Sequence, residues 1–157
     1  MLDAADLELF CRAHSLPARL VRLSVPTPTV QAAAEAVGCP TEQIVKSVLF
    51  MADGSPVVAV ASGLARINRR AVAEHCQTSG KRVRLASPQE VEAIAGYPVG
   101  ALPPFGHREP LLTLLDPRVL EQEKVYAGGG DENVLLEMDP QVIRKAVPTD
   151  VIDLTRA

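Results

Sequence analysis

Lys46 is the residue whose sequence neighbours most clearly indicate chemistry. It belongs to TEQIVKSVLF, residues 41–50, which we interpret as a β-strand. Because side chains of a strand alternate between two faces, Lys46 shares a face with the apolar Ile44, Val48 and Phe50. A buried ammonium is costly without a partner. The lysine could therefore extend its stem over an exposed face, pair with a carboxylate, or supply a cation at the floor of a cleft, where it would meet a carboxylate, phosphate or carbonyl oxygen.

A second candidate is the loop GYPVGALPPFGH, residues 96–107. Its glycines permit positive φ angles, and its prolines stiffen the chain between them. Backbone N–H groups held in a stiff loop suit an anion or oxyanion, since they need no reorganisation. An ordinary crossover is the alternative, although a long irregular segment in a compact domain favours a functional loop. The glycine-rich AGGGDEN, residues 127–133, is either a flexible hairpin tip or a close approach of backbone to ligand.

Other kinds of chemistry lack a sequence motif. The chain has no G-x-S-x-G, no dinucleotide-binding glycine motif and no phosphate-binding loop motif, and its three histidines have no evident nucleophile partner. The cysteines Cys11, Cys39 and Cys76 are widely spaced and form no zinc-ligand pattern, so we expect buried, reduced thiols. We predict neither a metal nor a cofactor.

The charge is unevenly distributed. Sixteen Lys and Arg against nineteen Asp and Glu give a net charge of −3, which argues against a general nucleic-acid coat protein. Residues 66–84, however, hold six basic residues and one acidic residue, a balance of +5 (6 − 1). The basic residues are Arg66, Arg69, Arg70, Lys81, Arg82 and Arg84. They could contact a phosphate backbone or form an ordinary solvated face.

The remaining pattern predicts alternating helices and strands. We expect helices at 3–14, 27–38, 69–76, 88–95 and 140–147, a short helix or turn at 117–123, and strands at 18–25, 41–50, 56–62, 81–86, 111–116, 124–127, 134–138 and 151–154. For the second helix we predict Thr27 as N-cap and Pro28 as first residue. Asn68 should cap the third helix, and Ser87 with Glu90 should form a capping box.

A hairpin together with helical crossovers indicates a mixed sheet. We therefore predict one α+β domain over residues 1–157, with a curved mixed sheet or partial barrel surrounded by helices. The N-terminus does not have the pattern of a signal peptide, and no apolar run reaches the ~18 residues of a membrane span. We expect a soluble cytoplasmic protein.

Three separated segments together resemble one family. They are TVQAAAEAVGCPTEQIVKSVLFMADGSPVVAVASG, VRLASPQEVEAIAGYPVGALPPFGH and LLTLLDPRVLEQEKVYAGGG. In this order they are similar to the YbaK / prolyl-tRNA synthetase-associated editing-domain family, over about residues 27–154. The resemblance implies a mixed sheet with a central cleft and hydrolysis, in trans, of the ester in mischarged aminoacyl-tRNA, typically tRNA(Pro). A substrate-assisted reaction, in which the ribose hydroxyl of the tRNA positions the water, would need no catalytic dyad.

The resemblance also implies roles for residues. Lys46 matches the family lysine, Gly100 and Pro104 match a G-x-x-x-P loop, and residues 128–130 match a glycine turn. The catalytic residues it implies are Lys46, Gly100 and Gly129. The implied substrate-binding residues are Ser47, Ala101, Leu102, Pro103, Pro104, Phe105, Gly106, Gly128, Gly130 and Asn133. The implied tRNA-binding residues are Arg66, Arg69, Arg70, Lys81 and Arg82. The implied partners are the 3′ end of aminoacyl-tRNA and a prolyl-tRNA synthetase or another translation factor.

Two positions depart from the family pattern. Asn133 stands where some relatives have a histidine, and Ser62-Gly63 stands where the family often has Gly-Asp. An asparagine can donate a hydrogen bond but cannot take up a proton at neutral pH. Two further hypotheses are therefore a non-catalytic module that binds tRNA or a synthetase, and an esterase acting on small aminoacyl esters.

Overall fold

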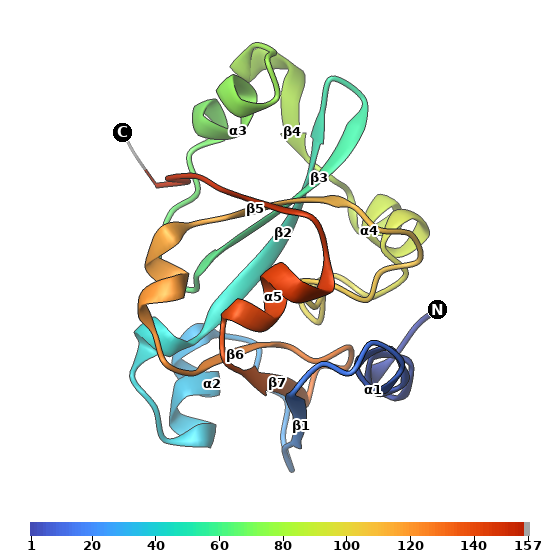
Figure 1. Cartoon of the computed structure of the whole chain (residues 1–157), viewed down its shortest axis with the longest axis vertical. Coiled ribbons are helices and arrows are strands. Elements are labelled where there is room, and N and C mark those ends of the chain that lie inside the picture. Colours follow the sequence, from blue (N-terminus) through green and yellow to red (C-terminus); the bar gives the residue numbers. More distant parts are fainter. Residues whose placement is uncertain (156–157) are drawn as a thin grey trace.

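The computed structural model describes residues 1–155, which fold into helices packed around two β-sheets (Figure 1). The α-helices are α1 (Ala4–Ala13), α2 (Val30–Val37), α3 (Arg69–His75), α4 (Pro88–Ile94) and α5 (Gln141–Ala146). The strands are β1 (Ala18–Arg22), β2 (Val45–Ala52), β3 (Ser55–Ser62), β4 (Val83–Leu85), β5 (Leu112–Leu115), β6 (Val125–Gly128), β7 (Val134–Met138) and β8 (Thr149–Val151). Short 3₁₀ helices occupy Thr41–Gln43, Gly80–Arg82 and Pro117–Glu121.

The larger sheet is mixed, in the order β4-β2-β3-β5-β8. Its β2–β3 hairpin and its β2–β4 pair are antiparallel, whereas β3–β5 and β5–β8 are parallel. The smaller sheet is antiparallel, in the order β1-β7-β6. An isolated bridge between Ile44 and Tyr126 joins the start of β2 to β6. The predicted α+β fold with a mixed sheet is confirmed, but its strands divide between two sheets and form no closed barrel within residues 1–155.

The hairpin that carries Lys46 closes as its sequence predicts. Asp53 and Gly54 have φ angles of 50° and 83°, which is the left-handed conformation that a tight two-residue hairpin turn requires. Eight residue pairs then run from Val45–Ser62 to Ala52–Ser55. This register fixes which side chains of β2 share a face.

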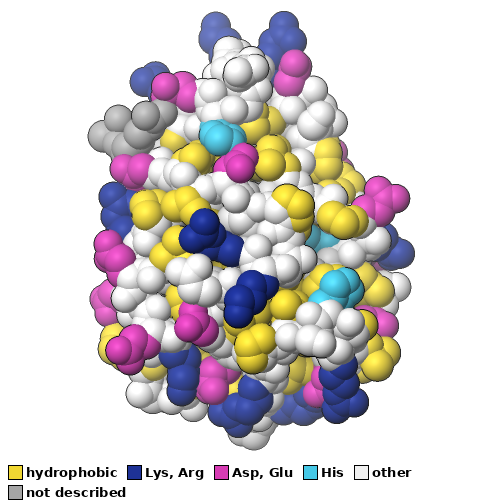
Figure 2. All heavy atoms as spheres, in the orientation of Figure 1, with side chains coloured by type: hydrophobic (Ala, Val, Ile, Leu, Met, Phe, Trp, Pro, Cys, Tyr) yellow, Lys and Arg dark blue, Asp and Glu magenta, His cyan; other side chains and the backbone are white. Residues whose placement is uncertain are grey.

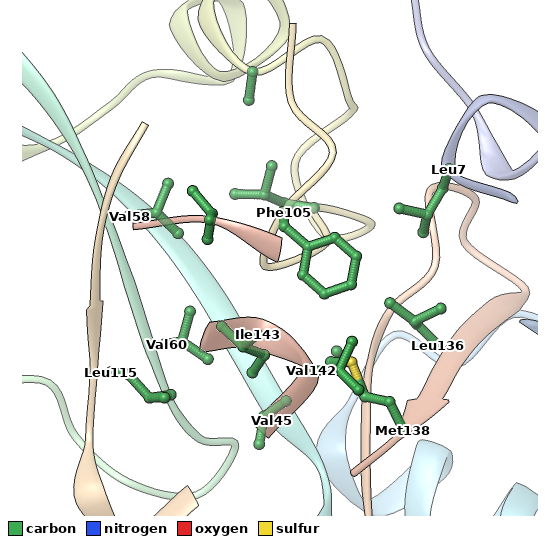
Figure 3. Packing of buried hydrophobic residues seen from close by; sticks show 14 of the residues in the cluster. Leu7, Val45, Val58, Val60, Phe105, Leu115, Leu136, Met138, Val142 and Ile143 are labelled. Atoms are coloured by element: carbon green, nitrogen blue, oxygen red, sulfur yellow. The ribbon is translucent and has the colours of Figure 1, made fainter. Parts of the chain in front are cut away.

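The two faces of β2 join different hydrophobic clusters. Val45 and Leu49 pack in the main cluster, where Phe105 and Leu7 also lie (Figure 3). Phe50 joins a second cluster on the face covered by α3, and Val48 packs against that cluster. Lys46 lies on the same face as Val48 and Phe50, as the alternation predicts. Because both faces of β2 pack against apolar side chains, the strand holds Lys46 rigidly.

Several predicted element ends are wrong. Helix α2 begins after Thr29, whose Oγ1 accepts from the Ala32 N–H at 3.0 Å, so Thr27 is not the cap and Pro28 precedes the helix. Residues 41–43 form a 3₁₀ turn, and Ile44 packs in a third cluster beside α2. The last strand is 149–151 and not 151–154, because residues 149–151 are the ones that pair with Thr113–Leu115 of β5.

Other local predictions are confirmed. Asn68 caps α3, and Ser87 with Glu90 forms a capping box on α4. All three cysteines are free, but only Cys11 is buried, whereas Cys39 and Cys76 are partly exposed. None of the helices within residues 1–155 combines the length and the apolar character needed to cross a bilayer.

Asp116 fixes the segment after β8. It is 1% exposed, and its carboxylate accepts from the backbone N–H groups of Arg118 and Leu154, both at 2.9 Å, and from the Arg118 guanidinium at 3.0 Å. Leu154 is itself fully buried. The Asp116 carboxylate therefore satisfies the buried N–H of Leu154 and also binds the exposed Arg118.

We expect Asp116→Ala to lower the free energy of unfolding by about 3 kcal/mol, because it leaves the Leu154 N–H buried without an acceptor. Glu8→Ala is the matched control, since Glu8 pairs with Arg12 at 3.6 Å on the exposed face of α1. That change should cost less than about 1 kcal/mol. Urea denaturation measures both values, and equal losses would contradict the role given to Asp116.

Candidate functional site

Lys46 lies where two cavities meet. Its Nζ donates a hydrogen bond of 2.6 Å to the carbonyl oxygen of Ala65, the side chain is half-buried, and that burial lowers the pKa of Lys46. An ammonium has three N–H donors, so two stay available after the bond to Ala65. The same side chain lines both cavities. Lys46 can therefore contact a ligand in either cavity.

The small cavity, of about 170 Å³, lies between the start of α2, the start of β2, the loop at 100–102 and the β6–β7 turn. Its lining residues are Thr27, Pro28, Thr29, Val30, Ala33, Ile44, Val45, Lys46, Ser47, Gly100, Leu102, Tyr126, Ala127, Gly128, Asp131, Glu132, Val134 and Leu135. Most of them are apolar. The polar exceptions are Thr27, Thr29, Lys46, Ser47, Tyr126, Asp131 and Glu132.

Ser47 has the most unusual environment in the small cavity. Its Oγ is buried and has no hydrogen-bond partner among residues 1–155. A buried hydroxyl without a partner costs free energy, so such groups are uncommon away from ligand sites. Because Ser47 lines the small cavity, its hydroxyl can bind a polar group held there.

The large cavity, of about 580 Å³, lies on the α3 side of β2. Its lining residues are Lys46, Val48, Phe50, Arg66, Ile67, Asn68, Arg69, Leu85 and Thr155. One wall is apolar, and three of the nine residues are cations. A volume of this size lies in the range of about 300–1,000 Å³ that is usual for ligand pockets.

The glycine turn packs directly on the loop at 100–102. A Cβ at Gly128 would overlap the carbonyl oxygen of Leu102, so only glycine permits this approach. The Gly130 N–H donates to the carbonyl oxygen of Ala101 at 3.0 Å. The Gly129 N–H donates to the carbonyl oxygen of Val134 at 3.1 Å. The turn therefore positions the loop, and its amides at 129 and 130 are already hydrogen-bonded within the fold.

Gly100 differs from the glycines of the turn. It is exposed, has a φ of 91°, and lines the small cavity. Its N–H makes no hydrogen bond within residues 1–155. Among the predicted backbone donors, the Gly100 amide is therefore available to a ligand and the Gly129 amide is not.

The buried Tyr97 and the partly buried His107 hold the remainder of the loop. The Tyr97 hydroxyl donates to the carbonyl oxygen of Gly106 at 3.0 Å, and burial raises the pKa of Tyr97. His107 Nε2 lies 2.8 Å from the carbonyl oxygen of Pro103, which can only accept, so Nε2 carries the proton. Burial lowers the pKa of His107. These bonds and the buried Phe105 ring keep the loop in one conformation.

Five of the predicted site residues line the small cavity: Lys46, Ser47, Gly100, Leu102 and Gly128. The others line neither cavity that contains Lys46: Ala101, Pro103, Pro104, Phe105, Gly106, Gly129, Gly130 and Asn133. Phe105 is fully buried in the main cluster, where its ring can be seen in Figure 3. Asn133 Nδ2 donates to the carbonyl oxygen of Leu23 at 3.2 Å and so ties the β6–β7 turn to the segment after β1.

The predicted tRNA-binding residues are also separated by the structure. Arg66 and Arg69 line the large cavity, while Arg70 and Lys81 line neither cavity. Arg82 pairs with Asp53 at 3.0 Å. Arg84 makes two bonds to Glu90, at 2.7 and 2.9 Å, which hold the pKa of Glu90 down to about 2. On the face shown in Figure 2, basic and acidic side chains are interspersed and form no large patch of one sign.

Comparisons with known proteins agree on one family. A family model described as "Aminoacyl-tRNA editing domain" matches residues 24–146. The chain belongs to this family.

Relatives of the editing domain include an uncharacterized protein and a proline–tRNA ligase. The chain is 32% identical over 114 residues to the uncharacterized protein YwhH of Bacillus subtilis (strain 168), covering 72% of this chain and 71% of the relative. It is 37% identical over 93 residues to a proline–tRNA ligase of Nitratidesulfovibrio vulgaris (strain Hildenborough), covering 57% of this chain but only 16% of the ligase. The chain therefore corresponds to a small part of that enzyme.

Solved structures share the whole fold of the editing domain. A crystal structure described as a proposed trans-editing enzyme for prolyl tRNA synthetase has a TM-score of 0.91 at 28% identity, with 98% of this chain and 97% of that chain covered. The structure of the hypothetical protein APE2540 has a TM-score of 0.88 at 34% identity, with 96% and 99% covered.

Sequence reasoning missed part of the site. Tyr126, Asp131 and Glu132 line the small cavity of the editing domain, as do residues 27–30. The acidic pair directly after the glycine turn is a signal that could have been used. No local pattern indicated that residues 27–30 line the cavity, because they reach it only through the packing of α2 beside β2. No group of three or more His, Cys, Asp or Glu side chains within residues 1–155 is arranged to hold a metal ion.

We expect the stability of the editing domain to fall as the pH drops through the unfolded-state pKa of histidine, about 6.5. The pKa of His107 is lower in the folded state, so the unfolded chain takes up the proton first and gains free energy. His107→Gln should abolish this loss of stability at low pH, whereas His14→Gln, at an exposed position, should retain it. Urea denaturation between pH 7.5 and 5 measures the free energy of unfolding of each protein. If this free energy fell equally with pH in the wild type and in His107→Gln, the role given to His107 would be contradicted.

Proposed function

We propose that this chain is a free-standing aminoacyl-tRNA deacylase that hydrolyses the ester of mischarged tRNA, with mischarged tRNA(Pro) as its substrate. The observation that carries the proposal is the position of Lys46 between two cavities, of which the smaller also exposes the unbonded Gly100 amide. Family membership supports the reaction class. The likeness to a structure described as a proposed trans-editing enzyme for prolyl tRNA synthetase, and to proline–tRNA ligases, supports tRNA(Pro) and a prolyl-tRNA synthetase as partner.

The small cavity suits the aminoacyl group. Its volume of about 170 Å³ admits a small side chain, and its walls are largely apolar. Asp131 and Glu132 place negative charge where the α-ammonium of an aminoacyl group needs a counter-charge. The unpartnered Ser47 hydroxyl supplies a hydrogen bond to the same group. The cavity therefore offers partners to each part of an aminoacyl ester.

The proposed reaction is attack of water on the ester carbonyl carbon. The water oxygen forms a bond to this carbon and the carbonyl oxygen becomes negative. The C–O bond to the ribose then breaks, and the ribose oxygen leaves with a proton that came from the water. The products are the free amino acid and the uncharged tRNA.

The protein contributes electrostatic stabilisation in this reaction. The Lys46 ammonium and the Gly100 N–H can both donate to the developing oxyanion. The Gly129 N–H is given no such part, since it already donates to Val134. An aminoacyl ester is activated, so no nucleophilic side chain is needed, and the neighbouring ribose hydroxyl of the substrate can position the water.

We expect Lys46→Met to lower the rate of deacylation by about 10²-fold or more, because it removes a cation aimed at the oxyanion while keeping the length of the stem. The free energy of unfolding should change by no more than about 1 kcal/mol, since the lost bond to Ala65 and the relieved burial of the ammonium oppose each other. Hydrolysis of alanyl-, cysteinyl- and seryl-tRNA(Pro) under single-turnover conditions measures the rate.

Lys145→Met is the control, because Lys145 is an exposed residue of α5 that lines neither cavity. It should behave as the wild type in both measurements. A Lys46→Met protein that hydrolyses its substrate at the wild-type rate would refute the assigned role of Lys46. A wild-type protein that binds tRNA but hydrolyses none of the three substrates would favour the non-catalytic binding module.

A further inference from the structure

The large cavity is lined both by apolar side chains and by cations. Val48, Phe50, Ile67 and Leu85 form its apolar wall, and Leu85 is 62% exposed although it is a large hydrophobic residue. Leu64, which is 54% exposed, lies in the segment that leads from β3 to Arg66. An exposed leucine in the wall of a cavity favours a partner that presents flat apolar surface.

The same cavity is positively charged. Lys46, Arg66 and Arg69 line it, and among residues 1–155 no Asp or Glu does so. Within residues 1–155, neither arginine pairs with a carboxylate, and Arg69 donates only to the carbonyl oxygen of Val83, at 3.3 Å. By contrast, Arg82 and Arg84 of the same basic segment are paired with Asp53 and Glu90. Of the four basic residues in this segment that pair with no carboxylate within residues 1–155, Arg66 and Arg69 line the cavity, whereas Arg70 and Lys81 do not.

Cations and apolar surface in one groove are the features that bind single-stranded nucleic acid. Guanidinium groups hold phosphates, and aromatic or apolar side chains can cover the faces of unstacked bases. The large cavity also adjoins the small cavity through Lys46, which lines both. A strand whose aminoacylated end lies in the small cavity would therefore continue along the large one.

We infer that the large cavity binds the unpaired nucleotides that precede the aminoacylated 3′ end of tRNA, with Arg66 and Arg69 holding their phosphates and Leu85 covering a base. This inference rests on the proposed function for its choice of substrate. Arg82 and Arg84, which are paired with carboxylates, and Arg70 and Lys81, which line neither cavity, take no part in it. The basic segment thus contains a specific binding surface of two arginines and not a general one of six basic residues.

Binding of an uncharged RNA tests this inference without depending on catalysis. A fluorescent single-stranded oligonucleotide ending in CCA-3′, the end that tRNAs share, is titrated with protein and followed by anisotropy. The double variant Arg66→Gln/Arg69→Gln should bind at least 10-fold more weakly than the wild type. Its plot of log K against log salt should be shallower by about 1.4, since each single-strand phosphate contact contributes about 0.7.

Arg12→Gln/Arg144→Gln is the matched control, because it removes the same charge from exposed positions outside both cavities. It should bind within 2-fold of the wild type. Arg66→Gln alone guards against a folding defect, since Arg66 makes no hydrogen bond within the described chain, and it should weaken binding by several-fold. Leu85→Ser should weaken binding by about 5-fold and leave the salt dependence unchanged.

Equal affinities of the two double variants would overturn the inference. Tighter binding of AMP than of the oligonucleotide would also overturn it, since the occupant would then be a free mononucleotide. The double variant Arg66→Gln/Arg69→Gln could lose RNA binding while the wild-type protein hydrolyses none of the mischarged tRNAs. These two results together would refute the proposed function and still support this binding surface.

Discussion

A half-buried ammonium bonded to a single backbone carbonyl is the feature on which the site depends. Burial removes water from Lys46, and the Ala65 carbonyl replaces only part of that solvation. The remaining donors of the ammonium then favour an anionic or carbonyl oxygen brought by a substrate. Strand β2 maintains this unfavourable position because both of its faces are packed against apolar clusters. The packing of the sheet thus offsets the free-energy cost of holding the partly desolvated Lys46 ammonium at the site.

The cavities arise from the way in which the two sheets meet. The Ile44–Tyr126 bridge brings β6 beside the start of β2, and Gly128 lets the loop at 100–102 approach the same place. A side chain at position 128 would push this loop away. The glycine turn therefore shapes the small cavity through close packing, and Tyr97 and His107 hold the later part of the loop through their bonds to Gly106 and Pro103. The proposed deacylation requires such fixed donors, because their reorganisation would otherwise add to the barrier.

The sequence predicted well what depends on local chemistry. The Asp53-Gly54 turn, the Asn68 cap and the Ser87–Glu90 capping box each follow from a few adjacent residues. The predicted start of α2 was wrong because two threonines flank Pro28 and either could serve as the N-cap. The division of the strands into two sheets was not predicted, since strand partners distant in sequence leave no local pattern. In the site, Lys46 was identified by its apolar neighbours, whereas the hydrogen bonds of Gly129 and Asn133 depend on tertiary contacts.

The most direct test of the account is to observe Lys46 while a substrate analogue binds. An aminoacyl-adenosine with an amide in place of the ester cannot be hydrolysed, and NMR of the lysine side-chain ammonium groups reports their contacts. On addition of the analogue, the Lys46 signal should shift strongly and its exchange with water should slow, with the Lys145 signal unchanged. A saturated complex in which the Lys46 signal stays as in the free protein would contradict the central claim.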